Sequence, residues 1–288
     1  MHFGHVLTAM ITPFDANNHV DFNTMTTLIE HLIRNGTEGL VITGTTGESS
    51  TLSSEEREEI YEHVVNVVNK RVPVLAGTGT NDTKSSIIQT KIASKFGVDG
   101  IMLVSPYYNR PNQAGLYEHF NTIANSTDLP IMLYNIPGRT SVYIEPETII
   151  ELSKIENIVS VKESNGNLDH ITTIIANTPS EFTVYSGDDS MTLPIMAVGG
   201  TGVVSVASHI IGIEINKMVK SFIAGNISEA GQLHRELLPI MNALFMSPSP
   251  APVKAALKLK GLDVGSVRLP LVDLTKEEQK MLKQLIIS

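Results

Sequence analysis

The most informative chemical group in the sequence is a lysine at the end of a short apolar run. Residues 158–161, Ile-Val-Ser-Val, lead into Lys162, and a polar turn follows at residues 164–167. A run of this kind is typical of a strand that is buried on both faces, as in parallel sheets. Lysine is rarely left buried without a partner. We therefore expect Lys162 to reach water, to pair with a carboxylate, or to lose its proton.

Loss of the proton would make Lys162 reactive. Burial penalises the ammonium form and lowers the pKa of a lysine from its ordinary value of about 10.4. A neutral amine can attack a ketone and form a Schiff base. The plainer interpretation is a structural ion pair or a side chain that reaches the rim of the fold. This segment alone favours the plainer interpretation.

Other polar residues follow other apolar runs, and each has two interpretations. The turn at residues 44–47, Gly-Thr-Thr-Gly, is either a tight turn or a backbone cradle for a carboxylate. Tyr134 lies at the end of an apolar run, and a buried phenol there needs a hydrogen-bond partner. It is either a residue of the packed core or part of a proton relay. Arg139 is either a surface residue or a clamp for a substrate carboxylate. Polar side chains at or just after the ends of predicted strands are Thr45, Thr46, Tyr107, Tyr108, Tyr134, Arg139, Lys162, Asp188 and Ser205.

Composition narrows the class of protein. The chain has 288 residues, is 42% hydrophobic and carries a net charge of −9, which predicts a globular fold and argues against nucleic acid or an anionic membrane as partner. Absence of cysteine excludes disulfides and thiolate chemistry. Residues 1–5 show no cationic segment before a long apolar stretch, so we expect no signal peptide and a cytoplasmic protein. Residues 193–213 lack charged side chains, but their glycines, serines and His209 favour a helix, a turn and a strand over a membrane span.

Metal and nucleotide sites are not predicted. The glycine runs at residues 77–79 and 199–202 lack the Lys-Ser/Thr ending of a phosphate loop. The nine histidines are scattered without the spacing of metal ligands. Asp188 and Asp189 are expected to cap the next helix. We therefore expect neither a metal nor a nucleotide in the site.

The spacing of the apolar runs predicts the fold. Eight short runs alternate with helical patterns, which is the signature of repeated βα units and a parallel sheet. Eight units favour a closed (β/α)₈ barrel. The rival, an open doubly wound sheet, would carry a glycine-rich turn after its first strand, where this chain has Thr12-Pro13-Phe14-Asp15. The runs are residues 6–11, 39–43, 72–76, 100–104, 130–134, 158–162, 182–185 and 202–206.

Local signals place the helices around these strands. Asp21 or Asn23, the capping box of Ser53 and Glu56, and Asp82 mark helix starts. From about residue 226 the pattern becomes purely helical. We predict a catalytic barrel at residues 1–225 and a C-terminal helical appendage at residues 226–288 that packs on the barrel.

Three motifs, in this order, resemble the pyruvate-dependent class I aldolase and lyase superfamily. They are residues 44–49 (Gly-Thr-Thr-Gly-Glu-Ser), 134–140 (Tyr-Asn-Ile-Pro-Gly-Arg-Thr) and 161–164 (Val-Lys-Glu-Ser). The likeness is greatest to the dihydrodipicolinate synthase family and runs the whole length of the chain. It implies condensation of pyruvate with L-aspartate-4-semialdehyde through a lysine Schiff base. The product would be 4-hydroxy-tetrahydrodipicolinate, in the diaminopimelate route of lysine biosynthesis, with no cofactor beyond the covalent imine.

The resemblance also implies a role for each site residue. Lys162 would form the imine with pyruvate, and Tyr134 would transfer protons together with Thr45. Tyr108 would join this relay from a neighbouring subunit, which implies a homodimer or a homotetramer. The implied substrate-binding groups are Thr46 and the Val204 backbone around the pyruvate carboxylate, Gly187 beside the substrate, and Arg139 on the carboxylate of the semialdehyde.

Alternatives within and outside the superfamily stay open. Sister enzymes, N-acetylneuraminate lyase and the keto-deoxy sugar acid aldolases, share the lysine and the tyrosine. Arg139 and the two threonines favour the synthase, because a polyhydroxy substrate calls for neutral groups where this chain has a guanidinium. A non-catalytic member that binds a keto acid is the rival from a different class. The intact lysine, tyrosine and arginine argue against it.

The sequence departs from the family at a regulatory position. In members inhibited by lysine, the resemblance implies an effector pocket that uses histidines and a glutamate. The matching positions here are Ser54, Arg57 and Ser85. We expect feedback inhibition by lysine to be weak or absent.

Overall fold

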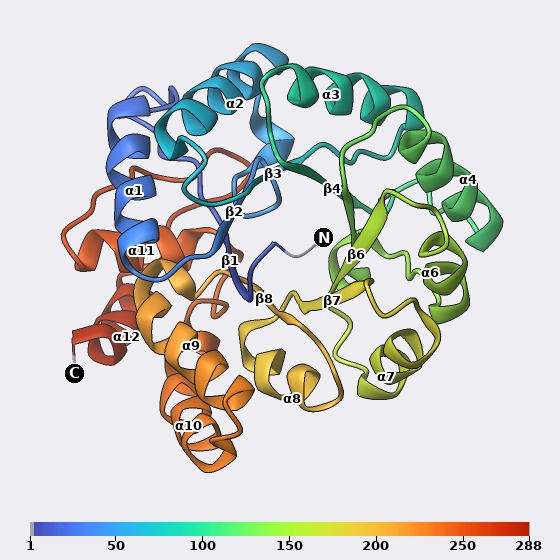
Figure 1. Cartoon of the computed structure of the whole chain (residues 1–288). Coiled ribbons are helices and arrows are strands. Elements are labelled where there is room, and N and C mark those ends of the chain that lie inside the picture. The colour runs from blue at the N-terminus through green and yellow to red at the C-terminus, as the bar shows by residue number, and fades with distance from the viewer. Residues whose placement is uncertain (1–2, 288) are drawn as a thin grey trace.

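The computed structural model describes residues 3–287, and its eight strands close into a parallel barrel (Figure 1). Each strand pairs with its neighbours in sequence, and β8 closes the barrel by pairing with β1. The (β/α)₈ barrel predicted from the spacing of apolar runs is therefore confirmed. The strands are β1 (Val6–Ala9), β2 (Gly39–Ile42), β3 (Val74–Gly77), β4 (Gly100–Val104), β5 (Ile131–Asn135), β6 (Ile158–Glu163), β7 (Thr183–Ser186) and β8 (Gly202–Ser205).

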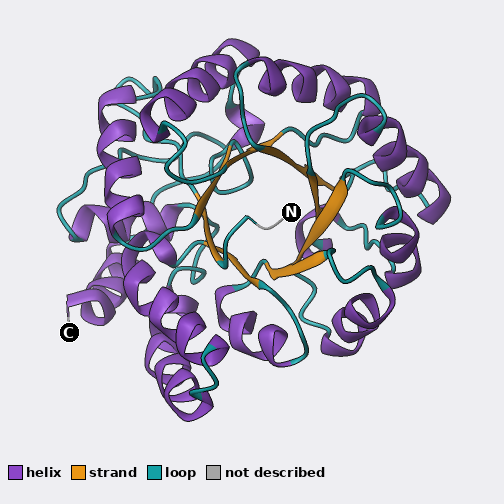
Figure 2. Ribbon diagram, in the orientation of Figure 1, coloured by secondary structure: helices purple, strands orange, loops and turns teal. Residues whose placement is uncertain are grey.

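Helices surround the strands and form the outer ring in Figure 2. The short helices α5 and α6 between β5 and β6 were not predicted, because segments of 4 and 7 residues show too few turns for a helical period. The helices are α1 (Phe22–Arg34), α2 (Ser54–Val68), α3 (Thr83–Lys95), α4 (Gln113–Ala124), α5 (Pro137–Thr140), α6 (Pro146–Leu152), α7 (Leu168–Asn177), α8 (Thr192–Ala197), α9 (Ser208–Ile223), α10 (Ile227–Ala243), α11 (Ala251–Leu259) and α12 (Lys276–Ile287), with 3₁₀ turns η1 (Ser49–Thr51) and η2 (Asp189–Met191).

The predicted capping residues begin three of these helices. Asp21, Ser53 and Asp82 each accept a hydrogen bond from the backbone N–H three residues ahead. The capping box of Ser53 and Glu56 is formed in both directions. Each cap provides an acceptor for a backbone N–H group that has no partner within the helix. It stabilises the folded protein by about 1 kcal/mol.

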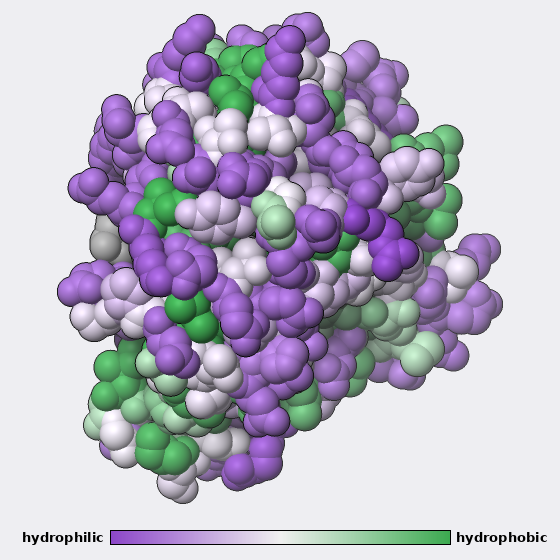
Figure 3. Space-filling model, turned by 90° about the vertical axis from the view of Figure 1, so that its right-hand side faces the viewer, coloured by the Kyte–Doolittle hydropathy of each residue, from purple (hydrophilic) through white to green (hydrophobic). Residues whose placement is uncertain are grey.

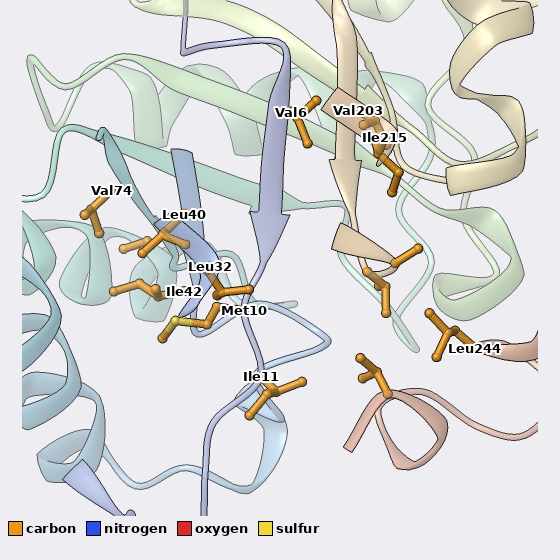
Figure 4. Packing of buried hydrophobic residues seen from close by; sticks show 14 of the residues in the cluster. Val6, Met10, Ile11, Leu32, Leu40, Ile42, Val74, Val203, Ile215 and Leu244 are labelled. Atoms are coloured by element: carbon orange, nitrogen blue, oxygen red, sulfur yellow. The ribbon is translucent and has the colours of Figure 1, made fainter. Parts of the chain in front are cut away.

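The apolar core has two layers, separated by the sheet. The outer layer lies between strands and helices, where outward side chains such as Val6, Leu40 and Val203 meet Leu32 and Ile215 (Figure 4). The inner layer fills the barrel itself and consists of Phe3, Leu7, Ala9, Val41, Leu75, Met102, Met132, Tyr134, Tyr185 and Val204. This filling makes the barrel a packed core and leaves ligand space only where the strands end.

The C-terminal helices pack on one side of the barrel. α9 contacts β1 and α1, α10 packs against α9, and α12 packs against α10 and α11. In Figure 1, α10 and α12 stand outside the ring of helices, at the lower left. The predicted boundary between residues 225 and 226 falls in the short connection from α9 to α10, and the division into a barrel and an appendage stays a prediction.

Residues 193–213 form most of α8, then β8 and the start of α9, in the order that the sequence predicted. Within residues 3–287, no helix is long and apolar enough to cross a membrane. Figure 3 shows hydrophilic side chains over most of one face, with apolar side chains in scattered patches.

Candidate functional site

A cavity of about 180 Å³ lies at the C-terminal ends of the strands. Six of the eight predicted site residues line it, although they come from four different strand ends or the loops after them. In barrels of this type, catalytic side chains gather at this end. The lining residues are Thr45, Thr46, Tyr134, Ile136, Arg139, Lys162, Ser164, Gly187, Asp188, Val206, Phe245 and Ser249.

Lys162 and Tyr134 face each other inside the barrel mouth. They are register partners on β6 and β5, and the Nζ atom of Lys162 lies 4.1 Å from the centre of the Tyr134 ring. Lys162 is only 5% exposed, yet no carboxylate within residues 3–287 pairs with it. The Tyr134 hydroxyl likewise makes no hydrogen bond within the described chain. Both groups are therefore free to react with a ligand in the cavity.

Gly187 makes room for this lysine. A Cβ atom at position 187 would lie 1.9 Å from the Ser164 hydroxyl and 2.9 Å from Cε of Lys162. Any larger residue would displace the reactive side chain. The Ser164 hydroxyl is itself buried without a hydrogen-bond partner, so it is a further group that a ligand can engage. Ser164 was not predicted as a site residue from the sequence.

The loop after β2 presents two threonines to the cavity. The loop is tightened by backbone bonds from Glu48 to Thr45 and from Ser49 to Gly44, at 3.1 and 3.2 Å. Thr46 is 6% exposed. Neither threonine hydroxyl makes a hydrogen bond within the described residues. The Gly-Thr-Thr-Gly turn is thus a tight turn that also offers two free hydroxyls.

A buried ion pair attaches this loop to the C-terminal helices. The Glu48 carboxylate lies 2.6 Å from Nζ of Lys254 on α11, and both side chains are almost fully buried. The Arg268 backbone N–H donates to the same carboxylate at 2.8 Å. Burial lowers the pKa of Lys254, and the charge of Glu48 opposes that shift. The position of Thr45 and Thr46 therefore depends on residues about 200 positions away in the chain.

Asp189 fixes the segment after β8, whose Val206 lines the cavity. Its carboxylate accepts hydrogen bonds from the Ser205 hydroxyl and from the backbone N–H groups of Val206 and Ala207, the latter two at 3.0 and 2.9 Å. Burial raises the pKa of Asp189, and these hydrogen bonds oppose the shift. Asp188 caps η2 through the Ser190 N–H, as predicted, whereas Asp189 was wrongly assigned to capping and instead joins β7 to β8.

Arg139 extends the site outward. It lies on α5, lines the cavity of Lys162, and also lines an adjoining cavity of about 350 Å³ together with Arg57 and Tyr107. Within residues 3–287, Arg139 has no ion-pair partner. A guanidinium that is free in this way suits a carboxylate of a bound molecule.

Two predicted site residues lie apart from the cavity. Tyr108 is 90% exposed and has a backbone φ of +72°, so within one chain it does not line the site. Val204 is buried among the side chains inside the barrel, and Val206 lines the cavity instead. The roles predicted for Tyr108 and for the Val204 backbone stay predictions.

Phe245 and Ser249 were missed by sequence analysis. Both lie between α10 and α11, where the sequence shows only a helix end and a Ser-Pro-Ser-Pro break. The fold brings them to the cavity of Lys162. No local sequence pattern predicts that these two residues reach the cavity, because their position depends on how the C-terminal helices pack on the barrel.

The fold and site together define a class of protein. A (β/α)₈ barrel whose mouth holds an unpaired buried lysine under a tyrosine, beside free hydroxyls and a free guanidinium, is typical of the class I aldolases and lyases. Within residues 3–287 there is no group of three or more His, Asp or Glu side chains arranged to hold a metal ion.

The chain belongs to the dihydrodipicolinate synthetase family, whose model matches residues 2–288. The 4-hydroxy-tetrahydrodipicolinate synthase of Bacillus subtilis is 58% identical over 287 residues, which are 99% of each chain. That of Bacillus velezensis is 57% identical over 286 residues, again 99% of each. The predicted family and the predicted enzyme class are confirmed, and these relatives have the name of the predicted synthase.

Solved structures agree with this assignment. A dihydrodipicolinate synthase of Bacillus anthracis is 55% identical, with a TM-score of 0.98 and coverage of 100% of this chain and 99% of the other. The enzyme of Cyanidioschyzon merolae, solved with lysine bound, is 45% identical with a TM-score of 0.97, covering 99% and 97%. A structure described as the first monomeric variant of the enzyme is 37% identical with a TM-score of 0.97, covering 99% and 96%.

The Glu48–Lys254 pair gives a stability prediction. Lys254→Met removes the ammonium and leaves the Glu48 carboxylate buried without its partner. We expect the free energy of unfolding to fall by about 3–5 kcal/mol, measured as a lower midpoint of urea unfolding. The double variant Glu48→Gln/Lys254→Met leaves no buried charge and should recover most of the loss.

Lys258→Met is the matched control. Lys258 lies on the same helix and pairs with Asp263, but its side chain is 68% exposed. Its loss should change the stability by less than about 1 kcal/mol. Equal urea midpoints for Lys254→Met and the control would contradict the structural importance of the buried pair.

Proposed function

We propose that this chain condenses pyruvate with L-aspartate-4-semialdehyde in the cytoplasm, with Lys162 as the residue that forms the imine. The observation that carries the proposal is the pair of Lys162 and Tyr134, buried, unpaired and 4.1 Å apart in a cavity that opens where the strands end. A structural lysine would have a carboxylate beside it. A nucleophilic lysine needs an open position for the carbonyl carbon.

The charges of the site suit these substrates. Lys162 and Arg139 line the cavity, and the only carboxylate among the described lining residues, Asp188, accepts hydrogen bonds from Ser190. Both substrates carry a carboxylate. We place the carboxylate of pyruvate beside the Thr46 hydroxyl, with Gly187 and the Val204 backbone nearby, and the carboxylate of the semialdehyde on Arg139.

The reaction begins on Lys162. Its amine attacks the keto carbon of pyruvate, and loss of water from the resulting carbinolamine gives the imine. An iminium withdraws electrons more strongly than a ketone, so a methyl proton is lost and an enamine forms. Each of these steps moves a proton, and we assign its transfer to Tyr134, whose ring centre lies 4.1 Å from the Lys162 amine.

The enamine carbon then attacks the aldehyde carbon of the second substrate. The new carbon–carbon bond regenerates the iminium, and the aldehyde oxygen takes up a proton. The amino group of the bound semialdehyde attacks the iminium carbon and expels the amine of Lys162, which closes the ring and frees the enzyme. Thr45 lines the same cavity as Tyr134, and we assign it to the relay that returns the protons.

Trapping with borohydride tests the role of Lys162. With pyruvate and borohydride, the protein should gain one reduced pyruvate per chain on the peptide that contains Lys162, and Lys162→Ala should gain none. Tyr134→Phe should be modified on the same peptide, with kcat lowered by roughly 10²–10⁴ because proton transfer is impaired. Peptide mapping by mass spectrometry and a turnover assay give both results.

Lys154→Ala is the control, since Lys154 is an exposed lysine paired with Glu151. It should be trapped and should turn over like the wild type. Wild-type turnover in Lys162→Ala, or a modified peptide elsewhere in the chain, would overturn the proposal.

We assign Tyr108 to the relay of a neighbouring subunit. Within one chain its ring is 90% exposed, and its neighbour Tyr107 lines the cavity next to the site. A large exposed aromatic side chain is more easily explained when another chain covers it. The proposal therefore requires at least a homodimer.

Mixed oligomers test whether Tyr108 acts in a neighbouring subunit. Tyr108→Phe and Lys162→Ala are each expected to be nearly inactive. In a mixed dimer, one site combines an intact Lys162 with an intact Tyr108 from the other chain, so activity should return after subunit exchange. Assays before and after exchange measure the gain. If Tyr108 served its own chain, no activity would return.

The adjoining cavity bears on regulation. Arg57 and Arg139 line it, and the only carboxylate of its described lining, Glu48, is paired with Lys254. The Ser85 hydroxyl donates to Asp82, and Ser54 is exposed in the first turn of α2. A cavity with two guanidinium groups and no free acid disfavours the two ammonium groups of lysine. We therefore propose weak or absent feedback inhibition.

A titration of the wild-type enzyme with L-lysine tests this expectation. Initial rates at saturating substrates should stay within about twofold of the uninhibited rate up to the millimolar range, which is the scale of ordinary metabolite and KM values. D-lysine serves as a control for ionic effects. Half-inhibition by L-lysine, and not by D-lysine, below about 1 mM would contradict the proposal.

A further inference from the structure

A buried carboxyl group lies directly beside the reactive lysine in the chain but points the other way. Successive side chains of a strand face opposite sides of the sheet. Tyr134 and Lys162 point into the barrel, so the next pair in register, Asn135 and Glu163, points outward toward the helices. Glu163 is 1% exposed and does not line the cavity.

Both oxygens of Glu163 receive hydrogen bonds from side-chain amides. Asn135 donates from Nδ2 to Oε1 at 2.9 Å, and Asn165 donates from Nδ2 to Oε2 at 2.7 Å. Burial raises the pKa of Glu163 to about 8, and the bond from Asn135 opposes this shift. Without these two donors, the carboxyl group would be buried with nothing to satisfy it.

Backbone hydrogen bonds fix the orientation of the Asn135 and Asn165 side-chain amides, so neither amide can flip. Asn135 accepts from the Ile144 N–H at 3.1 Å and donates to the Ile144 carbonyl at 3.0 Å. Asn165 accepts from the Asn167 N–H at 2.6 Å. Because the backbone fixes which end of each amide is the oxygen, both must present N–H groups to Glu163.

β5 and β6 need a contact that fixes the register of their pairing. The pairing of β5 with β6 is irregular near its start, where Ile131 pairs with Ile158 but Met132 already pairs with Ser160. A shift of one residue in a strand turns every side chain to the opposite face. The bond between Asn135 and Glu163 lies beyond the irregularity, on the pair next to Tyr134 and Lys162.

We propose that Glu163 is a positioning residue that fixes the Tyr134 ring against the Lys162 amine by holding β5 and β6 in register through Asn135, while Asn165 fixes the other oxygen of its carboxylate. The inference rests on the proposed roles of Tyr134 and Lys162. It extends them by assigning a function to a residue that cannot touch the substrate. Glu163 acts on proton transfer at the imine and leaves the binding of pyruvate largely unchanged.

Exchange of the methyl protons of pyruvate measures proton transfer at the imine separately from the rest of the reaction. In D₂O without the semialdehyde, the enzyme should exchange these protons through the enamine, and NMR measures the rate. The rate is divided by the number of sites that borohydride traps at saturating pyruvate, so that unfolded protein is not counted. The quotient reports proton transfer in a folded site.

Glu163→Gln is the principal variant. Its amide offers one acceptor to two fixed donors, so its NH₂ group faces the N–H of either Asn135 or Asn165 and the two donors repel, which strains the contact between β5 and β6. We expect the exchange rate per trapped site to fall by about 10- to 100-fold, the scale of a misplaced catalytic group, with the KM for pyruvate within about twofold. Asn165→Ala keeps the bond between Asn135 and Glu163 and removes the bonds of Asn165 to Glu163, Tyr143 and Asn167, so it should lose less.

A compensating variant distinguishes positioning from damage. In Glu163→Gln/Asn165→Asp, the new amide at 163 donates to the new carboxylate at 165, which still accepts from the Asn167 N–H. The double variant has the same formal number of carboxylates as the wild type with Glu163 ionised. We expect this double variant to recover most of the exchange rate. The control is Glu147→Gln, an exposed change on α6 of the same crossover, which should behave like the wild type.

Each outcome decides the proposal. Loss of exchange per trapped site in Glu163→Gln, with recovery in the double variant, supports it. An exchange rate per trapped site within about twofold of the wild type, or a loss that the double variant does not restore, overturns it. A wild type that fails to trap pyruvate on Lys162 would instead overturn the proposed function, so the two failures are distinguishable.

Discussion

The amine of Lys162 lies inside the barrel without a carboxylate beside it, and the rest of the site is built around this condition. Alternation along β6 sends Val161 outward into the apolar layer, Lys162 inward and Glu163 outward again. The face of the Tyr134 ring then lies next to the amine. An aromatic face attracts a cation yet takes no proton from it. The lysine is thus held in place by a weak contact with an aromatic ring. A carboxylate at the same distance would hold it in an ion pair.

The acidic residues near the site agree with this condition, because each of them binds a group other than the Lys162 amine. Glu48 pairs with Lys254, Asp189 accepts from the backbone after β8, and Glu163 accepts from two amides behind the sheet. Even Asp188, which lines the cavity, is held by Ser190. Within residues 3–287, none of these acids forms an ion pair with the amine. The burial of these carboxyl groups is costly, and the cost is offset by hydrogen bonds that also set the shape of the site.

The sequence predicts what depends on neighbours along the chain. Strand runs, helix caps such as Asp21 and Asp82, and polar residues at strand ends follow from local chemistry, and the motifs around Thr45, Tyr134 and Lys162 indicate the family. The approach of Ser249, the pairing of Glu48 with Lys254 and the outward bond of Glu163 could not be predicted, because each joins segments that meet only when the barrel closes and the C-terminal helices dock. Tyr108 shows the same limit between chains. Its exposure within one chain fits the proposed role in a neighbouring subunit, but it does not indicate which contact would bring it there.

The C-terminal helices belong to the chemistry of the barrel. α11 supplies Lys254 to the loop of Thr45 and Thr46, and the following segment supplies Arg268, whose guanidinium donates to Glu56 and to the Thr51 carbonyl. The segment before α11 places Phe245 and Ser249 on the cavity. A barrel cut at the boundary predicted from the helical pattern would keep Lys162 but lose one wall of its cavity and the partner of Glu48. The loop of Thr45 and Thr46 would then lose its attachment to α11. The appendage therefore contributes to the shape of the site as well as to the stability of the fold.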